Sequence, residues 1–465
     1  MTDAASHDAE AVVSRLRAAL ADKVDTSVTA LEHARADQSG HRSSGRPLAV
    51  VHAESVGDIQ TALAIAHQTD TPVVTRGAGT GLAGAALAGP RELVISTLAM
   101  NRVLRVDSTD LIAVVEPGII NATLNDELAP SGLWWPPDPA SRAISTVGGN
   151  IATGAGGLLC AKYGVVADWV LGLDIVLADG RLIRTGRQTV KGVAGLNLTS
   201  LIVGSEGQLG IIVGATLKLA RLVPGEKYTL TGVFPTVRAA ADAATAISAS
   251  GVQPAIMELM DATTLAAVHE LLELAAPARD AALLTIQTDG PAARAEAESI
   301  AATIASAGGY ATLATTPDEG EELLHRRRSV HPALARRGTT LIEDVSVPRS
   351  RMAAMFDEIT RIEQHYAITI PTVAHAGDGN LHPNFIFDGP VVPEHIWRAA
   401  DELFRAALSL GGTLTGEHGV GTLKSRWLAE ELGHDQWQLQ RDIVRVFDPT
   451  GIMNPGKVFQ EHPDA

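Results

Sequence analysis

Alternating apolar and polar positions predict a strand–helix–strand unit near the start of the chain. An amphipathic helix is expected over residues 8–22, followed by a loop. Strands are expected over 47–52 and 72–76. The helix between them begins after Ser55, which with Asp58 three residues later has the pattern of a capping box. Its apolar residues keep the three- and four-residue spacing of a helix that packs on a sheet.

Between residues 90 and 225 the pattern becomes β-rich, with short apolar runs that glycines interrupt. The run "LGLDIVLADGRLIRTG" predicts a hairpin, because Asp179 and Gly180 separate two apolar segments. The later run "LIVGSEGQLGIIVGATLKLA" predicts a second strand region with glycine turns. This part of the chain is therefore expected to form sheets joined by tight turns.

From residue 228 to 410 strands and helices alternate, which is typical of an α+β domain. Strands are expected over 228–234, 281–288 and 367–374, and helices over 236–250, 290–307, 350–366 and 393–410. The tail from 447 to 459 is a compact Pro/Gly segment.

Length and charge narrow the functional class. A chain of 465 residues predicts two or three domains. The net charge of −16 argues against nucleic acid as a partner, whereas local arginines could still attract a small anion. The single cysteine, Cys160, excludes an internal disulfide. No signal peptide or apolar run of bilayer length is visible, so a cytoplasmic location is expected, and peripheral membrane contact stays open.

The segment "RGAGTGLAGAA" is rich in glycine and follows a predicted strand. Gly79, Gly81 and Gly84 match a dinucleotide fingerprint, but Gly89–Pro90 interrupts the helix that this motif requires, and no acidic residue stands near position 99. We therefore reject a Rossmann NAD site. Exposed N–H groups in tight glycine turns still suit a phosphate, although a plain surface loop is the alternative. A second glycine cluster at 136–164 favours a long, phosphate-bearing cofactor.

Six motifs occur in order: "PVVTRGAGTGLAG", "PPDPAS…STVGGNIATGAGG…KYG", "GSEGQLGII", "HAGDGNLHP", "TGEHGVG" and "FDPTGIMNPGK". In these the chain resembles the FAD-dependent 2-hydroxyacid dehydrogenases of the vanillyl-alcohol oxidase superfamily, a group that includes the glycolate oxidase FAD subunit, D-lactate dehydrogenase and D-2-hydroxyglutarate dehydrogenase. The resemblance implies an α+β fold with a two-part FAD-binding domain. It also implies four regions: an N-terminal helix and loop (1–44), the FAD domain (45–225), a substrate or cap domain with a metal site (226–425) and a segment that returns to the flavin (426–465).

The resemblance also implies which residues hold FAD, bound non-covalently. Cys160 is expected to be an ordinary buried residue, although some members of the superfamily tether flavin through Cys or His. Lys457 is expected in the tail that closes near the flavin ring. The expected cofactor-binding residues are Arg76, Gly77, Ala78, Gly79, Thr80, Gly81, Gly84, Pro137, Asp138, Ser141, Ser145, Gly148, Gly149, Asn150, Ala152, Thr153, Gly154, Glu206, Gly207, Gly210, Ile212 and Asn454.

Two histidines, His375 and His382, flank a Gly-Asp-Gly-Asn turn. Imidazole and carboxylate suit Zn²⁺, and a catalytic zinc site has three protein ligands and an open position. The resemblance implies that both histidines and Glu417 bind a divalent metal. Two structural histidines at strand ends are the alternative. The resemblance further implies that His418 is the general base and places Asn380 among the catalytic residues.

A carboxylate substrate needs a cationic partner, and "ELLHRRRSVHPAL" aligns with the Leu-Trp-x-x-Arg of the family. The aligned residue is Arg327, with Arg326 and Arg328 as alternatives. Glu343 stands where hydroxyglutarate-type relatives tend to carry Lys, which favours a monocarboxylate such as D-lactate or glycolate. D-2-hydroxyglutarate, or a different alcohol, is the alternative substrate. A quinone, a cytochrome or an electron-transfer flavoprotein is the expected electron acceptor, and a homodimer stays open.

Overall fold

The computed structural model describes residues 2–460, with side chains from residue 9 onward. Contacts between residues divide the chain into two units, each discontinuous in sequence. Unit 1 comprises Met1–Gly156, Val165–Leu222 and Glu417–Ala465, and unit 2 comprises Gly157–Gly164 and Val223–Gly416. The sequence placed the second domain at 226–425. In the structure, unit 2 ends at Gly416, and it also includes the eight residues 157–164 from the first half of the chain.

The first sheet of unit 1 has the strand order β1-β2-β4-β3, with β2, β4 and β3 parallel. Helix α3 joins β2 to β3, as the sequence predicts. The Ser55 hydroxyl accepts the N–H of Asp58, and the Asp58 carboxylate accepts the N–H of Glu54 rather than that of Ser55, so the capping box is shifted by one residue. The elements are α1 (Thr2–Leu20), β1 (Val24–Asp25), α2 (Val28–Ala34), β2 (Ala49–His52), α3 (Val56–Gln68), β3 (Val73–Arg76) and β4 (Leu93–Ser96).

The second sheet of unit 1 has the order β5-β6-β10-β8-β9 and is antiparallel throughout. The predicted hairpin is confirmed, since β8 pairs with β9 across the Asp179–Gly180 turn. The elements are β5 (Val103–Asp107), β6 (Ile112–Val115), α4 (Asn121–Leu128), β7 (Leu133–Trp134), α5 (Val147–Thr153), β8 (Val170–Val176), β9 (Leu182–Gly186), α7 (Leu198–Ile202), β10 (Ile211–Lys218) and β11 (Ala220–Arg221).

Unit 1 is completed by the end of the chain. Helices α15 (Gly421–Leu432) and α16 (His434–Phe447), which the sequence analysis did not assign, lead into the Pro/Gly tail. There Val73 donates its N–H to Ile452, and Asn454 donates its N–H to Val73. The tail thus lies beside β3 and contributes Ile452 and Met453 to the core of the first sheet.

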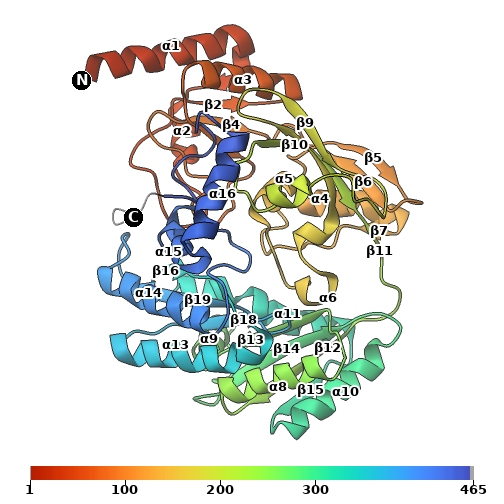
Figure 1. Ribbon diagram of the computed structural model, residues 1–465. Helices are drawn as coiled ribbons and strands as arrows, with labels where there is room; N and C mark the ends of the chain where they lie inside the picture. Colours follow the sequence, from red (N-terminus) through yellow and green to blue (C-terminus); the bar gives the residue numbers. More distant parts are fainter. Residues whose placement is uncertain (1, 461–465) are drawn as a thin grey trace. The chain divides into compact units, whose positions relative to one another are not determined.

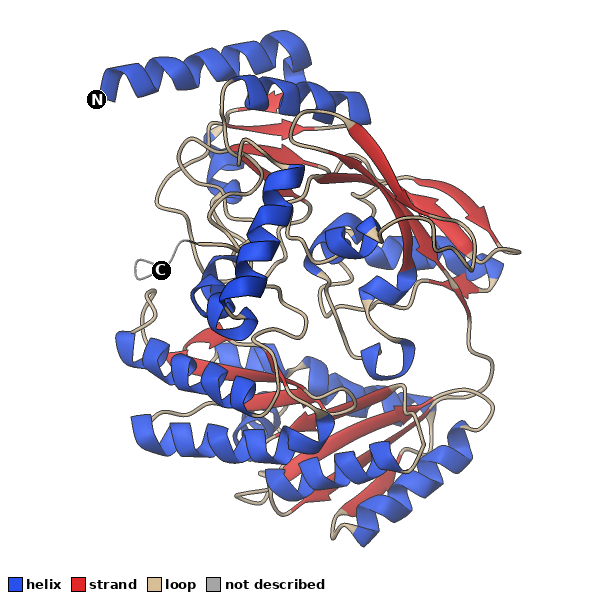
Figure 2. Ribbon diagram, viewed as in Figure 1, coloured by secondary structure: helices blue, strands red, loops and turns tan. Residues whose placement is uncertain are grey.

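Unit 2 is built on one antiparallel sheet of order β15-β12-β14-β13-β18-β19-β16, with β17 paired to β19 (Figure 2). Helices α14, α13, α8 and α10 lie side by side over this sheet (Figure 1). The strands are β12 (Tyr228–Phe234), β13 (Ile256–Met260), β14 (Ala282–Thr288), β15 (Tyr310–Leu313), β16 (Thr339–Ile342), β17 (Val345–Ser346), β18 (Thr372–His375) and β19 (Asn380–Phe387). The helices are α6 (Cys160–Tyr163), α8 (Val237–Ala249), α9 (Ala262–Leu271), α10 (Ala293–Ser306), α11 (Pro317–Arg328), α12 (Val330–Ala335), α13 (Met352–Tyr366) and α14 (Glu394–Ser409).

A row of polar residues crosses the middle of this sheet. Thr285, Glu258, His375, Asn380 and Ser346 are register partners, one strand after the next. Direct partners in a sheet point to the same face. Four of them, from Thr285 to Asn380, are at most 5% exposed. This continuous row of buried polar residues marks the face as a candidate site.

Candidate active site

The first glycine segment forms an open loop after β3. No helix follows Gly84, and the next regular element is β4, which confirms the rejection of a Rossmann site. Within residues 2–460, none of the backbone N–H groups of residues 77 to 84 donates a hydrogen bond. A Cβ at Gly77 would lie 2.4 Å from Oγ1 of Thr146, so only glycine fits there. The loop therefore presents a set of free N–H donors, and it fits the pyrophosphate of FAD.

The side chain of Arg76 binds backbone carbonyl groups. Its guanidinium donates to the carbonyls of His33, Ala36 and Ala86. These contacts tie the N-terminal loop to the glycine segment. Arg76 can therefore bind a phosphate through its backbone rather than through its guanidinium.

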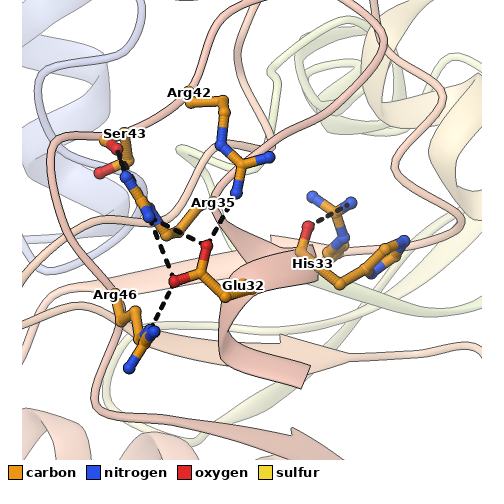
Figure 3. A network of polar contacts seen from close by, with 7 residues as sticks. Glu32, His33, Arg35, Arg42, Ser43 and Arg46 are labelled. Atoms are coloured by element: carbon orange, nitrogen blue, oxygen red, sulfur yellow. Dashed lines mark hydrogen bonds and ion pairs between the residues drawn. The ribbon is translucent and has the colours of Figure 1, made fainter. Parts of the chain in front are cut away.

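Close by, Glu32 organises the same N-terminal loop (Figure 3). Its carboxylate pairs with three guanidinium groups, those of Arg35, Arg42 and Arg46. Hydrogen bonding from Arg46 does most to hold the pKa of Glu32 below its ordinary value. The network is exposed, so its role is local ordering of the loop rather than a large gain in stability.

The second glycine segment packs against the first. Thr146 caps α5 by accepting the N–H of Gly149, and the buried Asn150 side chain contacts Ser145 and Asn121. The Asn121 amide also donates to the carbonyl of Pro137. These bonds hold the expected cofactor residues of 137–154 as one rigid wall beside the first loop.

The third expected segment, 204–212, meets the second through Glu206. The N–H of Glu206 donates to Ala152, 2.8 Å away. Its carboxylate accepts the N–H groups of Val420 and Gly421, 2.7 and 2.8 Å away. Burial raises the pKa of Glu206 to about 7. The side chain thus anchors the loop that follows His418, a role that the sequence analysis did not foresee.

The C-terminal tail binds both cofactor segments through Asn454. Its amide donates to the carbonyls of Ala85 and Glu206. Asn454 has a φ of 45°, in the left-handed region that Asn tolerates better than most residues. Lys457 pairs with Glu92, 3.1 Å away. The expected closure of the tail over the FAD domain is therefore built on specific polar contacts.

The two histidines of unit 2 lie on one face of a hairpin. His375 ends β18 and His382 is the third residue of β19, and the four-residue turn between them includes Gly379 with a φ of 93°. A Cβ at Gly379 would lie 2.2 Å from the carbonyl oxygen of Val347. The imidazole rings are edge to face, with centroids 5.0 Å apart. This hairpin brings the pair together as the sequence predicts.

Each histidine faces a buried carboxylate through its Nδ1. His375 Nδ1 is 2.7 Å from Oε1 of Glu258, and His382 Nδ1 is 3.8 Å from Oδ1 of Asp344. Both carboxylates are at most 1% exposed. Burial opposes ionisation of Glu258, but the charges of His375 and Arg327 outweigh it and lower its pKa. The hydrogen bond between Nδ1 of His375 and Glu258 makes Nε2 the metal-binding atom of that ring, so the histidine pair fits a divalent metal.

The chain leaves unit 2 immediately beside this pair. Thr415 donates its hydroxyl to Asp344, and a Cβ at Gly416 would lie 2.5 Å from the side chain of Asn380. Glu417 and His418 are the next two residues, where unit 1 resumes. His418 Nε2 is 3.7 Å from Oε1 of Glu417, and both side chains are largely buried.

Within the described residues, Arg327 is the one of the three consecutive arginines that contacts Glu258, the carboxylate beside His375. Its Nε donates to Oε2 of Glu258, 2.6 Å away, and its side chain is 15% exposed. Arg328 is exposed and pairs with Glu321 on the surface. The buried Nε of Arg326 has no hydrogen-bond partner among residues 2–460. The geometry therefore favours Arg327 among the three alternatives.

Sequence reasoning missed Glu258 and Asp344. The signal for Glu258 was available, because a single Glu interrupts the apolar strand "AIMELM". A buried charge in such a run requires a partner. For Asp344 no comparable signal exists, since "IEDVS" also suits an exposed turn.

Residues 157–164 belong to unit 2, although the sequence indicated that they are part of the FAD domain. Lys162 and Tyr163 bind the two carboxylate oxygens of Asp289, and Ala161 packs on Gly377 in the histidine hairpin. Cys160 is partly buried, and its Sγ accepts the N–H of Gly157. These contacts explain why the segment belongs to unit 2.

Among the described residues, no helix has the length and apolarity needed to cross a bilayer.

Two family models match the chain. Residues 47–186 match an FAD binding domain, and residues 223–458 match the C-terminal domain of FAD linked oxidases.

Several curated proteins are similar over most of their length. The glycolate oxidase subunit GlcD of Bacillus subtilis is 40% identical over 420 residues, which cover 89% of each chain. The D-lactate dehydrogenase of Archaeoglobus fulgidus is 34% identical, over 89% of this chain and 91% of the relative. The mitochondrial D-lactate dehydrogenase [cytochrome] of Arabidopsis thaliana is 34% identical, over 97% and 80%.

Solved structures show the same fold at low identity. A p-cresol methylhydroxylase structure with substrate bound superposes with a TM-score of 0.78, at 17% identity and 97% coverage of both chains. The 4-ethylphenol oxidase of Gulosibacter chungangensis gives 0.76, at 18% identity and 98% coverage of both. These likenesses confirm the expected α+β fold with its two-part FAD-binding domain. The chain belongs to the FAD-linked oxidases and is an FAD-dependent oxidoreductase.

Proposed function

We propose that the protein oxidises a small D-2-hydroxy monocarboxylate, D-lactate or glycolate, to the corresponding 2-oxo acid. The names of its relatives, glycolate oxidase subunit and D-lactate dehydrogenase, support this class of substrate. The observation that carries the proposal is in unit 2. One buried carboxylate, that of Glu258, holds both Arg327 and His375, and His375 lies edge to face with His382, so a carboxylate-binding group lies beside two possible metal ligands.

His375, His382 and Glu417 would hold the divalent cation, which we propose to be Zn²⁺. The two histidines present Nε2 from one sheet face, and Glu417 follows within one peptide bond of Gly416, which contacts Asn380. Two imidazoles and one carboxylate leave an open position for substrate. When bound, the cation supplies a Lewis acid at the substrate hydroxyl, and FAD supplies at N5 the acceptor for the substrate's hydride.

His418 removes the hydroxyl proton in this proposal. Imidazole titrates near neutral pH, so it can accept a proton from a polarised alcohol. The neighbouring Glu417 carboxylate stabilises the imidazolium that forms, 3.7 Å from Nε2. Asn380 is next to His375 in the sheet register, and its buried Oδ1 has no hydrogen-bond partner within residues 2–460. That oxygen can accept a hydrogen bond from substrate.

Arg327 binds the substrate carboxylate. Because Nε of Arg327 donates to Glu258, the two terminal nitrogens are the donors that can bind the two oxygens of the substrate carboxylate. Glu343 and Asp344 supply negative charge where a second substrate carboxylate would need a cation. Both are fully buried, and Asp344 lies 3.8 Å from His382. A monocarboxylate is therefore favoured over D-2-hydroxyglutarate.

A substrate panel with an artificial dye as electron acceptor tests this proposal. D-lactate, glycolate, D-2-hydroxyglutarate and an aromatic alcohol should be compared by kcat/KM. We expect one of the two monocarboxylates to be the best substrate. Preference for D-2-hydroxyglutarate by about tenfold or more, which is about 1.4 kcal/mol in transition-state free energy, would overturn the substrate assignment. Turnover of the aromatic alcohol alone would overturn the class.

A further inference from the structure

Glu258 contacts both halves of the proposed site in unit 2, the arginine and a histidine. It lies in the middle of β13 and is 1% exposed. Its Oε2 accepts a hydrogen bond from Nε of Arg327, and its Oε1 lies 2.7 Å from Nδ1 of His375. One carboxylate is thus shared by a guanidinium and an imidazole, and each partner uses a different oxygen.

The sheet register and one helix make this arrangement rigid. Glu258 and His375 are direct partners on β13 and β18, so their side chains leave the same face side by side. Arg327 comes from the last turn of α11. On the adjoining strand β14, Thr285 is the partner of Glu258 and is fully buried. A carboxylate in such surroundings is stable only while its charge is compensated.

The contacts decide which atoms stay available. Donation from Nδ1 of His375 to Glu258 leaves Nε2 of the ring as the ligand atom. Donation from Nε of Arg327 fixes the plane of the guanidinium, and within residues 2–460 its terminal nitrogens donate no hydrogen bond. Glu258 therefore sets the direction of a metal ligand and of a carboxylate-binding fork at once.

We infer that Glu258 is a positioning residue that couples binding of the divalent cation at His375 to binding of the substrate carboxylate at Arg327. This inference rests on the proposed function. A metal ligand held by an outer carboxylate binds its metal about 10- to 100-fold more tightly than one without it. Replacement of Glu258 would also release the guanidinium of Arg327. The affinity for the cation and the affinity for the substrate carboxylate would therefore fall together.

The experiment compares variants of the flavin-loaded full chain. Glu258→Gln keeps the size of the side chain but removes its charge and one of its two acceptor atoms. Asp261→Asn is the matched control. Asp261 directly follows β13 and is a partly buried carboxylate, but it accepts the N–H groups of Thr264 and Thr372 instead. Zn²⁺ affinity is measured by competition with a chelator, and KM for D-lactate is measured at saturating Zn²⁺.

We expect Glu258→Gln to weaken Zn²⁺ binding by about 10- to 100-fold and to raise KM for D-lactate even when Zn²⁺ is saturating. Asp261→Asn should lower thermal stability without either effect. Arg327→Met should raise KM while Zn²⁺ binding is retained, because His375 keeps its partner. A purely structural role for Glu258 would not separate the variants in this way.

Unchanged Zn²⁺ affinity in Glu258→Gln would overturn the inference, and so would equal losses in Asp261→Asn. If Glu258→Gln yields no folded protein, Glu258→Asp serves in its place. The shorter carboxylate cannot reach both partners, so at least one affinity must fall, and retention of both overturns the inference. The proposed function is tested separately: a wild-type protein that binds Zn²⁺ but oxidises neither D-lactate nor glycolate contradicts the proposed substrate and leaves the Zn²⁺ comparison intact.

Discussion

The side-chain amide of Asn454 donates a hydrogen bond to the backbone carbonyl of Glu206, 2.7 Å away and 248 positions earlier in the chain. A second hydrogen bond from the same amide reaches Ala85, beyond the first glycine loop. One side chain from the tail thus holds two segments that are expected to line the cofactor.

Replacing Asn454 by Ala should therefore lower both the stability of unit 1 and its affinity for FAD. Two buried carbonyls lose their donor, and each such loss costs about 1–3 kcal/mol. We expect a clear drop in the free energy of unfolding and a larger dissociation constant for FAD, measured by urea unfolding and by flavin fluorescence. Asn454→Gly is the control for the left-handed backbone. If it binds FAD like the wild type, the amide contacts are not needed.

Removal of a histidine ligand should separate metal from flavin. His382→Ala is expected to lose bound metal and turnover together, while the flavin absorbance spectrum stays that of the wild type, because the expected cofactor residues lie in unit 1. Metal content by elemental analysis and dye reduction provide the two readouts. Full turnover of His382→Ala in the presence of a chelator would show that no catalytic metal is held there.

Arg327 and His418 should give different kinetic signatures. Loss of a hydrogen bond to a charged group costs about 1.5–3 kcal/mol, so Arg327→Ala should lower kcat/KM by about 10- to 150-fold, mainly through KM. Arg328→Ala, on the exposed neighbour, is the matched control and should change little. His418→Ala should instead lower kcat by about 10²- to 10⁴-fold, as expected for a general base. Equal effects of Arg327→Ala and Arg328→Ala would contradict the assignment of the fork.

Glu206 predicts a pH-dependent stability. Burial raises its pKa from 4.5 to about 7, so the folded protein holds a proton that the unfolded chain releases above pH 4.5. The resulting stabilisation is complete below pH 4.5 and is lost as the pH rises through about 7, an effect of about 3 kcal/mol. Glu206→Gln should therefore lose less stability than the wild type over this range, as measured by urea unfolding at several pH values. If the free energy of unfolding changes with pH in the same way for both proteins, this prediction is wrong.

Much of the fold could be predicted because local patterns decide it. The strand 228–234 and the helices near 237, 293, 352 and 394 have strong periodicity and clear end signals, and the structure places them within a few residues of the predicted bounds. The histidine hairpin was predictable because Gly377 and Gly379 permit a tight reversal between two strands.

The rest of the candidate site depends on contacts between residues far apart in sequence. Nothing near Glu258 indicates that Arg327, 69 positions away, and His375, 117 positions away, will share its carboxylate. Likewise, the docking of residues 157–164 on unit 2 through Asp289 follows from packing that only the folded sheet defines. The carboxylate of Glu206, read from its motif as a cofactor contact, turns toward Val420 and Gly421 for the same reason.

The central claim is tested most directly by mixing the purified, flavin-loaded and metal-supplemented protein with D-lactate or glycolate in the absence of oxygen. The account predicts that one of these monocarboxylates bleaches the flavin absorbance in a single turnover and yields one equivalent of the 2-oxo acid, and that His418→Ala slows the bleaching. A flavin that stays oxidised with both acids, yet is reduced by an alcohol without a carboxylate, would contradict the account.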